Sequence, residues 1–154
     1  MKKLISTLLT FCLVLSIPIM FMGIAFGVLL ALGDDRADKE EVFEFVREKE
    51  EELLAAVASG DFSGFENQGF IKTIDAESSA VDFSCGGAGF GPETSYVGFY
   101  YSPDHNMNAV WCAPSSSQSL IPSGNGFEWQ DPQGDNWYYV EHICGNFYYY
   151  EASF

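Results

Sequence analysis

Beyond residue 33, the side chains that could act as nucleophiles, bases or metal ligands include three cysteines and two histidines: Cys85, Cys112, Cys144, His105 and His142. The cysteine spacings of 27 and 32 residues contain no C-x-x-C pair, so the sequence favours structural thiols over a zinc site. His142 and Cys144 would share one strand face, which leaves a catalytic Cys–His pair as an alternative. No G-x-S-x-G or S-x-x-K motif for an activated serine occurs.

The cysteines also end predicted strands, and in an oxidising compartment they could form a disulfide bond. In an up-and-down sheet, the strands that end at Cys85, Cys112 and Cys144 would finish at the same edge. Successive cysteines would lie about 9–10 Å apart, because each pair skips one strand. That separation exceeds the limit of about 7 Å for a bridge. A sheet that curls would bring the first and last of these strands together, so we expect a Cys85–Cys144 disulfide.

Two turn-like stretches could bind ions. The sequence "CGGAGFG" (85–91) lacks the lysine and the helix of a phosphate loop, and a hairpin connection explains it better. In "DPQGDN" (131–136), Asp131 and Asp135 offer oxygen ligands for calcium. The glutamate that closes an EF-hand loop is absent, so an ordinary β-turn is the favoured interpretation.

The stretch "FYYYEASF" (147–154) would place aromatic rings on both faces of a strand. A strand packed on both sides is the simpler interpretation. The functional alternative is an exposed aromatic surface for sugar rings or peptide, because tyrosine and tryptophan combine an apolar ring with a polar atom. Such a surface would be formed by Tyr148 and Tyr150 with Trp129 and Trp137, or with Trp111.

The spacing of hydrophobic residues predicts the helix and strands that would position these side chains, and its period changes along the chain. Residues 36–58 predict one amphipathic helix with a single apolar stripe: Val42, Phe45, Val46, Leu53 and Val57. From residue 70 onwards a period of two predicts strands at 70–75, 80–85, 95–102, 107–112, 127–130, 136–144 and 147–153. Residues 113–126 predict a polar loop. The fold class is therefore α+β, with one helix packed on an antiparallel meander sheet of six or seven strands.

The amino-terminal 33 residues predict a transmembrane anchor. Residues 4–32 carry no charge, and a helix of that length rises about 44 Å, more than the ~30 Å of bilayer hydrocarbon. Cleavage after Gly33, which would release a secreted protein, is the competing interpretation. Lys2 and Lys3 precede the span, so we expect residues 34–154 to lie outside the cytoplasm.

Residues 34–154 have the length of one domain and are strongly acidic. All 22 acidic residues and five of the seven basic ones lie there, a formal charge of −17, and no Lys or Arg follows Lys72. This charge argues against binding to nucleic acid or to anionic lipid headgroups. It is compatible with a solubilising surface, or with attraction of basic partners and divalent cations.

The stretches "CGGAGFGPETSYVGFYYSPD" (85–104) and "GDNWYYVEHICGNFYYYEASF" (134–154) resemble small membrane-anchored proteins of Gram-positive gut bacteria, a group with no assigned activity. The resemblance covers residues 79–154 and implies a bacterial cell-surface setting. We therefore expect a binding or interaction module that needs no cofactor, with an envelope protein, a glycan or a cation as its partner. The alternatives are a thiol- or His-dependent envelope enzyme and an accessory subunit of a membrane complex.

Overall fold

The computed structural model describes residues 36–66, 68–76, 80–90, 93–115 and 118–154. The chain divides into two compact units, Met1–Asp34 and Asp35–Phe154, and the described residues belong to the second. Within them no helix is long and apolar enough to cross a membrane. The predicted span at 4–32 lies outside the described residues.

Two short helices stand where the sequence predicted one. Helix α2 (Lys39–Glu48) begins at Asp38, whose carboxylate accepts a hydrogen bond from the amide N–H of Glu40 (2.9 Å). The helix stops at Lys49, and α3 (Glu50–Ser59) follows and ends at Gly60 in the left-handed conformation (φ 70°). The break divides the predicted stripe, so α2 buries Val42, Phe43 and Val46, whereas α3 buries Leu53 and Ala56.

The strands form one antiparallel sheet in the order β1-β2-β3-β7-β6-β5-β4. Their bounds are β1 Thr73–Asp75, β2 Val81–Phe90, β3 Glu93–Tyr101, β4 Ile121–Ser123, β5 Gly126–Gln130, β6 Trp137–Cys144 and β7 Phe147–Ser153. Seven strands with helices confirm the α+β class. The sheet is not one continuous meander, because the chain leaves β3, crosses to β4 and returns to pair β7 with β3.

Three segments differ from the prediction. Residues 107–112 form turns instead of a strand, and the predicted hairpin connection at 85–91 consists largely of the extended end of β2. Strand β4 occurs inside the predicted loop 113–126. The strand-like pattern of "MNAVWC" (107–112) belongs to a loop that packs on the sheet and buries Val110 and Cys112, with exposed Trp111 between them.

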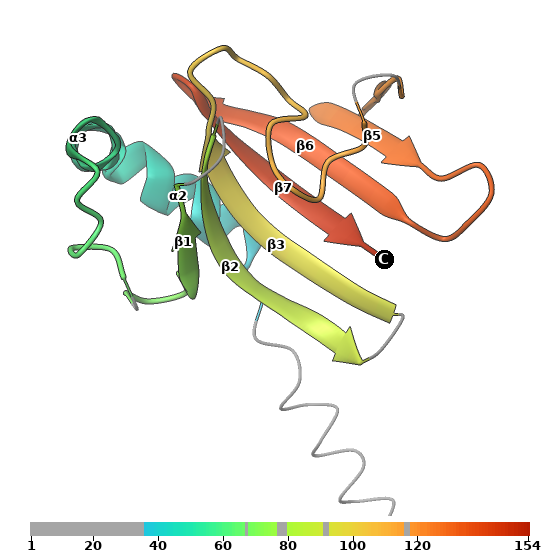
Figure 1. Ribbon diagram of the computed structural model, residues 1–154, viewed down its shortest axis with the longest axis horizontal. Coiled ribbons are helices and arrows are strands. Elements are labelled where there is room, and N and C mark those ends of the chain that lie inside the picture. The colour runs from blue at the N-terminus through green and yellow to red at the C-terminus, as the bar shows by residue number, and fades with distance from the viewer. Residues whose placement is uncertain (1–35, 67, 77–79, 91–92, 116–117) are drawn as a thin grey trace, which may run out of the picture. The chain divides into compact units, whose positions relative to one another are not determined.

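Each face of the sheet has its own cover, as Figure 1 shows: α2 lies behind it and the connection from β3 to β4 passes in front. We name the first the helix face and the second the loop face, and residues 102–120 are the crossover loop. Buried side chains on the helix face pack with α2 and include Phe83, Cys85, Phe99, Phe147 and Tyr149. Those on the loop face pack with the crossover loop and include Tyr100, Tyr138, Val140, Tyr148 and Tyr150.

The position of β7 in the middle of the sheet, with both faces covered, explains its four consecutive aromatic residues, 147–150. Strand β7 pairs with β3 and β6 along its two edges, and α2 and the crossover loop cover its two faces. Tyr148 is 3% exposed and Tyr150 is fully buried. The packed-strand interpretation is therefore confirmed, and these two tyrosines do not form an exposed surface.

Candidate functional site

A buried acid lies beneath the crossover loop. Asp82, in β2, is 6% exposed, and one of its carboxylate oxygens accepts a hydrogen bond from the Tyr150 hydroxyl (3.4 Å). The other oxygen, Oδ1, has no partner among the described residues. Burial raises the pKa of Asp82 to about 6, although hydrogen bonds from Tyr150 and Trp111 act in the opposite direction.

Two tyrosines fasten the crossover loop above this acid. Tyr100 and Tyr138 both donate a hydroxyl hydrogen bond to the backbone oxygen of Met107, at 2.8 and 2.9 Å. Burial raises the pKa of both hydroxyls, so they remain protonated donors at physiological pH. One carbonyl that accepts from two strands fixes the loop against the sheet.

An exposed tryptophan of the same loop packs on two half-buried aromatic residues from β3 and from the end of β7. Trp111 is 61% exposed, and its ring meets Tyr96 edge-on, with centroids 5.2 Å apart. Phe154 lies 6.1 Å from the indole at 31°. We name these three residues the Trp111 platform. The sequence suggested Trp111 only as an alternative to other residues, because the alternation of residues 107–112 predicted a strand and did not show which ring stays outside.

The other residues predicted for a binding surface do not meet. Trp129, in β5, is half-buried and packs with the loop-face cluster. Trp137, in β6, stacks on Tyr139 (6.2 Å, 13°), and Tyr139 packs with the helix-face cluster. The two tryptophans therefore belong to opposite faces of the sheet, and no single surface contains them.

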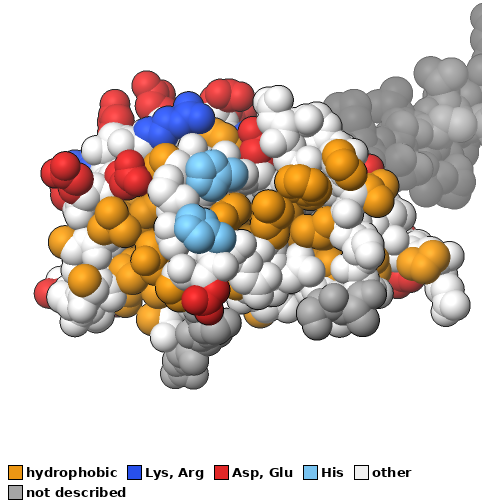
Figure 2. Space-filling model, turned by 90° about the horizontal axis from the view of Figure 1, so that it is seen from above, with side chains coloured by type: hydrophobic (Ala, Val, Ile, Leu, Met, Phe, Trp, Pro, Cys, Tyr) orange, Lys and Arg blue, Asp and Glu red, His pale blue; other side chains and the backbone are white. Residues whose placement is uncertain are grey.

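Both histidines contact Tyr148. His142 and Tyr148 are directly opposite in the β6–β7 pairing, and their ring centroids lie 5.3 Å apart at 67°. Nδ1 of His105, on the crossover loop, lies 3.1 Å from the Tyr148 hydroxyl oxygen. Figure 2 shows the two imidazoles, in pale blue, on an open face with hydrophobic side chains around them. Their meeting point was not predicted, because 37 residues separate them.

The three described cysteines are free thiols, so the expected Cys85–Cys144 disulfide is not formed. The registers of β6, β7, β3 and β2 place Cys144 level with Val81, four residues along β2 from Cys85 and three strands away. Cys112 packs on the loop face, on the other side of the sheet from Cys85. Burial raises the pKa of Cys85 and Cys112 far above the usual value for a thiol.

A bulge separates His142 from Cys144. The register shifts between these residues, so Cys144 pairs with Phe147 and packs with the helix-face cluster, whereas His142 contacts Tyr148 on the loop face. The hypothesis that the two share a strand face is therefore wrong. Burial, with Glu50 nearby, raises the pKa of Cys144 as well.

Opposite charges meet at the helix face. Nζ of Lys39 lies 2.5 Å from the carboxylate of Glu141, which also accepts from the Tyr139 hydroxyl (2.5 Å). Burial alone would lower the pKa of Lys39, but the hydrogen bonds to Glu141 and Tyr139 outweigh it and the pKa is raised. The cluster joins α2 to β6 and is satisfied internally, so it is a structural contact.

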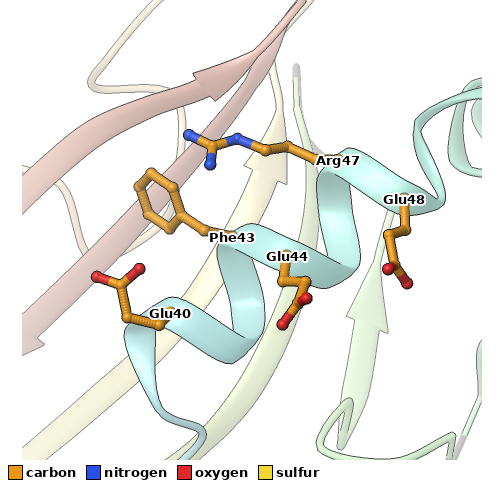
Figure 3. A pocket seen from close by; sticks show the side chains of 5 residues that line it. All are labelled: Glu40, Phe43, Glu44, Arg47 and Glu48. Atoms are coloured by element: carbon orange, nitrogen blue, oxygen red, sulfur yellow. The ribbon is translucent and has the colours of Figure 1, made fainter.

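An open depression of about 330 Å³ lies on α2, lined by Glu40, Phe43, Glu44, Arg47 and Glu48. Figure 3 shows the Arg47 side chain extending over Phe43, and its guanidinium carbon lies 5.2 Å from the ring centroid. The arginine thus covers the apolar part of the depression, and solvated carboxylates form the rest.

The proposed calcium residues lie in a turn. A carboxylate oxygen of Asp131 accepts from the amide N–H of Gln133 (2.9 Å), and Asp135 is exposed. This hydrogen bond is typical of an Asx-turn. The described residues hold no group of three or more His, Cys, Asp or Glu side chains that could bind a metal ion.

Comparisons with known protein families, with curated proteins and with solved structures found no match for this chain.

Proposed function

We propose that this chain is a membrane-anchored binding module, held in the bilayer by residues 4–32, whose acidic domain binds a glycan outside the cytoplasm. The observation that carries the binding role is the exposure of Trp111. A tryptophan ring that is 61% exposed, next to two other aromatic rings, leaves an apolar surface open to a ligand. The anchor, its orientation and the bacterial cell-surface setting rest on the sequence.

The packing of Trp111 against neighbouring side chains suits a rigid binding surface. Its ring packs against Tyr96 and Phe154, so the indole is held while most of it stays open. An aromatic side chain that is already ordered loses little conformational entropy when a ligand stacks on it. Sugar rings present C–H groups to such a face and hydroxyl groups to the polar atoms around it.

The charge of the domain narrows the class of ligand. A formal net charge of −15 for the whole chain repels nucleic acid, anionic lipid and acidic polysaccharide. A neutral or basic glycan meets no such repulsion. We therefore propose an uncharged or cationic cell-envelope polysaccharide as the ligand.

The thiol-dependent enzyme is the weaker alternative. A nucleophilic cysteine needs a lowered pKa and access to substrate. The three described thiols instead have raised pKa values because of burial. Cys144 and His142, the pair that could have formed a catalytic dyad, lie on opposite sides of the sheet.

Binding can be tested with the full-length protein in detergent, by sedimentation with purified cell-wall glycan. We expect the Trp111→Ala variant to remain in the supernatant, while wild type and the matched control Trp137→Ala sediment. Equal sedimentation of Trp111→Ala and wild type would overturn the proposal. Fractionation of cells tests the anchor separately, since the intact chain must appear in the membrane fraction. A stable partner that co-purifies in detergent, with no glycan bound, would favour the accessory subunit.

A further inference from the structure

The two histidines of the chain come from different elements and both contact Tyr148. His142 lies in β6 directly opposite Tyr148, and His105 reaches the hydroxyl of the same tyrosine from the crossover loop. Both histidines are exposed, whereas Tyr148 is buried below them. The sheet and the loop thus present two imidazoles at one place on the surface (Figure 2).

The hydrogen bond of His142 determines which nitrogen carries its proton. Nε2 lies 2.8 Å from the backbone oxygen of Gly145, and a carbonyl oxygen can only accept. Nε2 is therefore the protonated nitrogen, and Nδ1 of the neutral ring carries an unshared electron pair. Among the described residues Nδ1 of His142 has no hydrogen-bond partner.

His105 is held in a similar way, but by Nδ1 instead of Nε2. Its Nδ1 lies 3.1 Å from the Tyr148 hydroxyl oxygen, which can accept a hydrogen bond as well as donate one. When the hydroxyl accepts, Nδ1 carries the proton and Nε2 holds the unshared pair. Within the described part of the chain, Nε2 of His105 has no partner either.

An imidazole whose second nitrogen donates to a carbonyl or hydroxyl oxygen is the common form of a metal-binding histidine. The donated hydrogen bond fixes the tautomer and makes the free nitrogen a better ligand. The backbone of Gly145 supplies this contact for His142, and the Tyr148 hydroxyl supplies it for His105. Both imidazoles are therefore oriented by uncharged groups, not by exposed carboxylates.

We propose that His105 and His142 together bind one divalent transition-metal ion, of the class Cu²⁺, Ni²⁺ or Zn²⁺, with water in the remaining coordination positions. Imidazole nitrogen suits these ions, whereas Ca²⁺ and Mg²⁺ require oxygen ligands. The net charge of −15 raises the concentration of cations near the surface. The site is independent of the Trp111 platform and of the proposed glycan.

The test uses the full-length protein in detergent, with Ni²⁺ binding measured by titration calorimetry in excess Mg²⁺, which occupies non-specific carboxylate sites. We expect one Ni²⁺ ion per chain. His105→Ala and His142→Ala should each weaken binding by about tenfold or more, and the double variant should show only background binding. Circular dichroism checks that the variants remain folded, which we expect because both side chains are exposed.

Two further measurements exclude other ligands. Cys144→Ser should bind Ni²⁺ as wild type does, since the half-buried thiol is not part of the site. Electron paramagnetic resonance of the Cu²⁺ complex of wild type should show hyperfine coupling to two imidazole nitrogens, and this readout needs no variant. Unchanged Ni²⁺ affinity in the double histidine variant, or a Cu²⁺ spectrum without imidazole coupling, would overturn the proposal.

Discussion

The Tyr150 hydroxyl lies 3.4 Å from a carboxylate oxygen of Asp82, in the closed space between the sheet and the crossover loop. Asp82 is 6% exposed, and its Oδ1 has no hydrogen-bond partner among the described residues. A charge in such a place is poorly solvated, and one long hydrogen bond compensates little of that loss. Asp82 is therefore a source of instability whenever it is ionised.

The stability of the domain should depend on pH through Asp82. Its pKa rises from an ordinary value of 3.8 to about 6 on folding, so the folded state binds the proton more tightly. The group costs no stability below pH of about 4, and its cost grows between about 4 and 6 to a constant value near 3 kcal/mol above that window.

The Asp82→Asn variant, which carries no charge, should be more stable than wild type by about 3 kcal/mol at pH 7.5 and nearly equal to it at pH 4. Urea unfolding at the two pH values measures this difference. A gain in stability that is the same at both pH values would show that the effect is one of packing and not of ionisation.

Gly98 should not tolerate a side chain. A Cβ there would lie 2.6 Å from the Tyr150 hydroxyl oxygen and 2.7 Å from the backbone oxygen of Phe83, and the backbone oxygen cannot move aside. We expect Gly98→Ala to lower the free energy of unfolding by about 2–3 kcal/mol. Gly64→Ala is the matched control, because its Cβ would meet nothing within 4 Å. Equal stability of the two variants in urea would contradict the packing described for β3.

Tyr100 and Tyr138 should act on the crossover loop as a coupled pair. Each donates to the backbone oxygen of Met107, so removing one hydroxyl leaves the carbonyl satisfied by the other. Tyr100→Phe and Tyr138→Phe should each cost about 1 kcal/mol or less. The double variant should cost more than their sum, because the carbonyl then has neither hydroxyl. A double-variant cycle in urea measures the coupling, and strict additivity would mean that the two hydrogen bonds act independently.

Thiol accessibility should differ among the three described cysteines. Cys85 and Cys112 are buried and Cys144 is half-buried, so a membrane-impermeant maleimide should modify Cys144 first in the folded protein. Unfolding in urea should make all three react at similar rates. Peptide mapping without reductant checks the same point, and a linked Cys85–Cys144 peptide would show that oxidation rearranges the sheet from the form described here.

The alternation of hydrophobic residues was a reliable guide to strands that carry a regular register. Strands β6 and β7 match their predicted bounds closely because both are long and paired on two sides. The bulge before Cys144 was invisible, since one extra residue changes the face of a side chain without changing the sequence pattern. The free thiols and the separation of Trp129 from Trp137 follow from register and strand order, which alternation alone does not determine.

The site residues were missed for a related reason. Residues 107–112 alternate like a strand, although the alternation arises because the loop packs on the sheet through Val110 and Cys112. Trp111, between them, then faces solvent. The convergence of His105 and His142 on Tyr148 required knowing that the crossover loop lies over β7, a contact between segments distant in the sequence.

Because β7 lies between β3 and β6, the sheet cannot be completed until β7 has been synthesised. Without β7 the sheet consists of two separate parts, β1–β3 and β4–β6. The edges of β3 and β6 that pair with β7 are then unpaired. The pairing of β3 with β7 joins segments that are distant in the sequence, and such long-range contacts slow folding. An unpaired strand edge can pair with another chain, so the domain is prone to aggregation until β7 is in place.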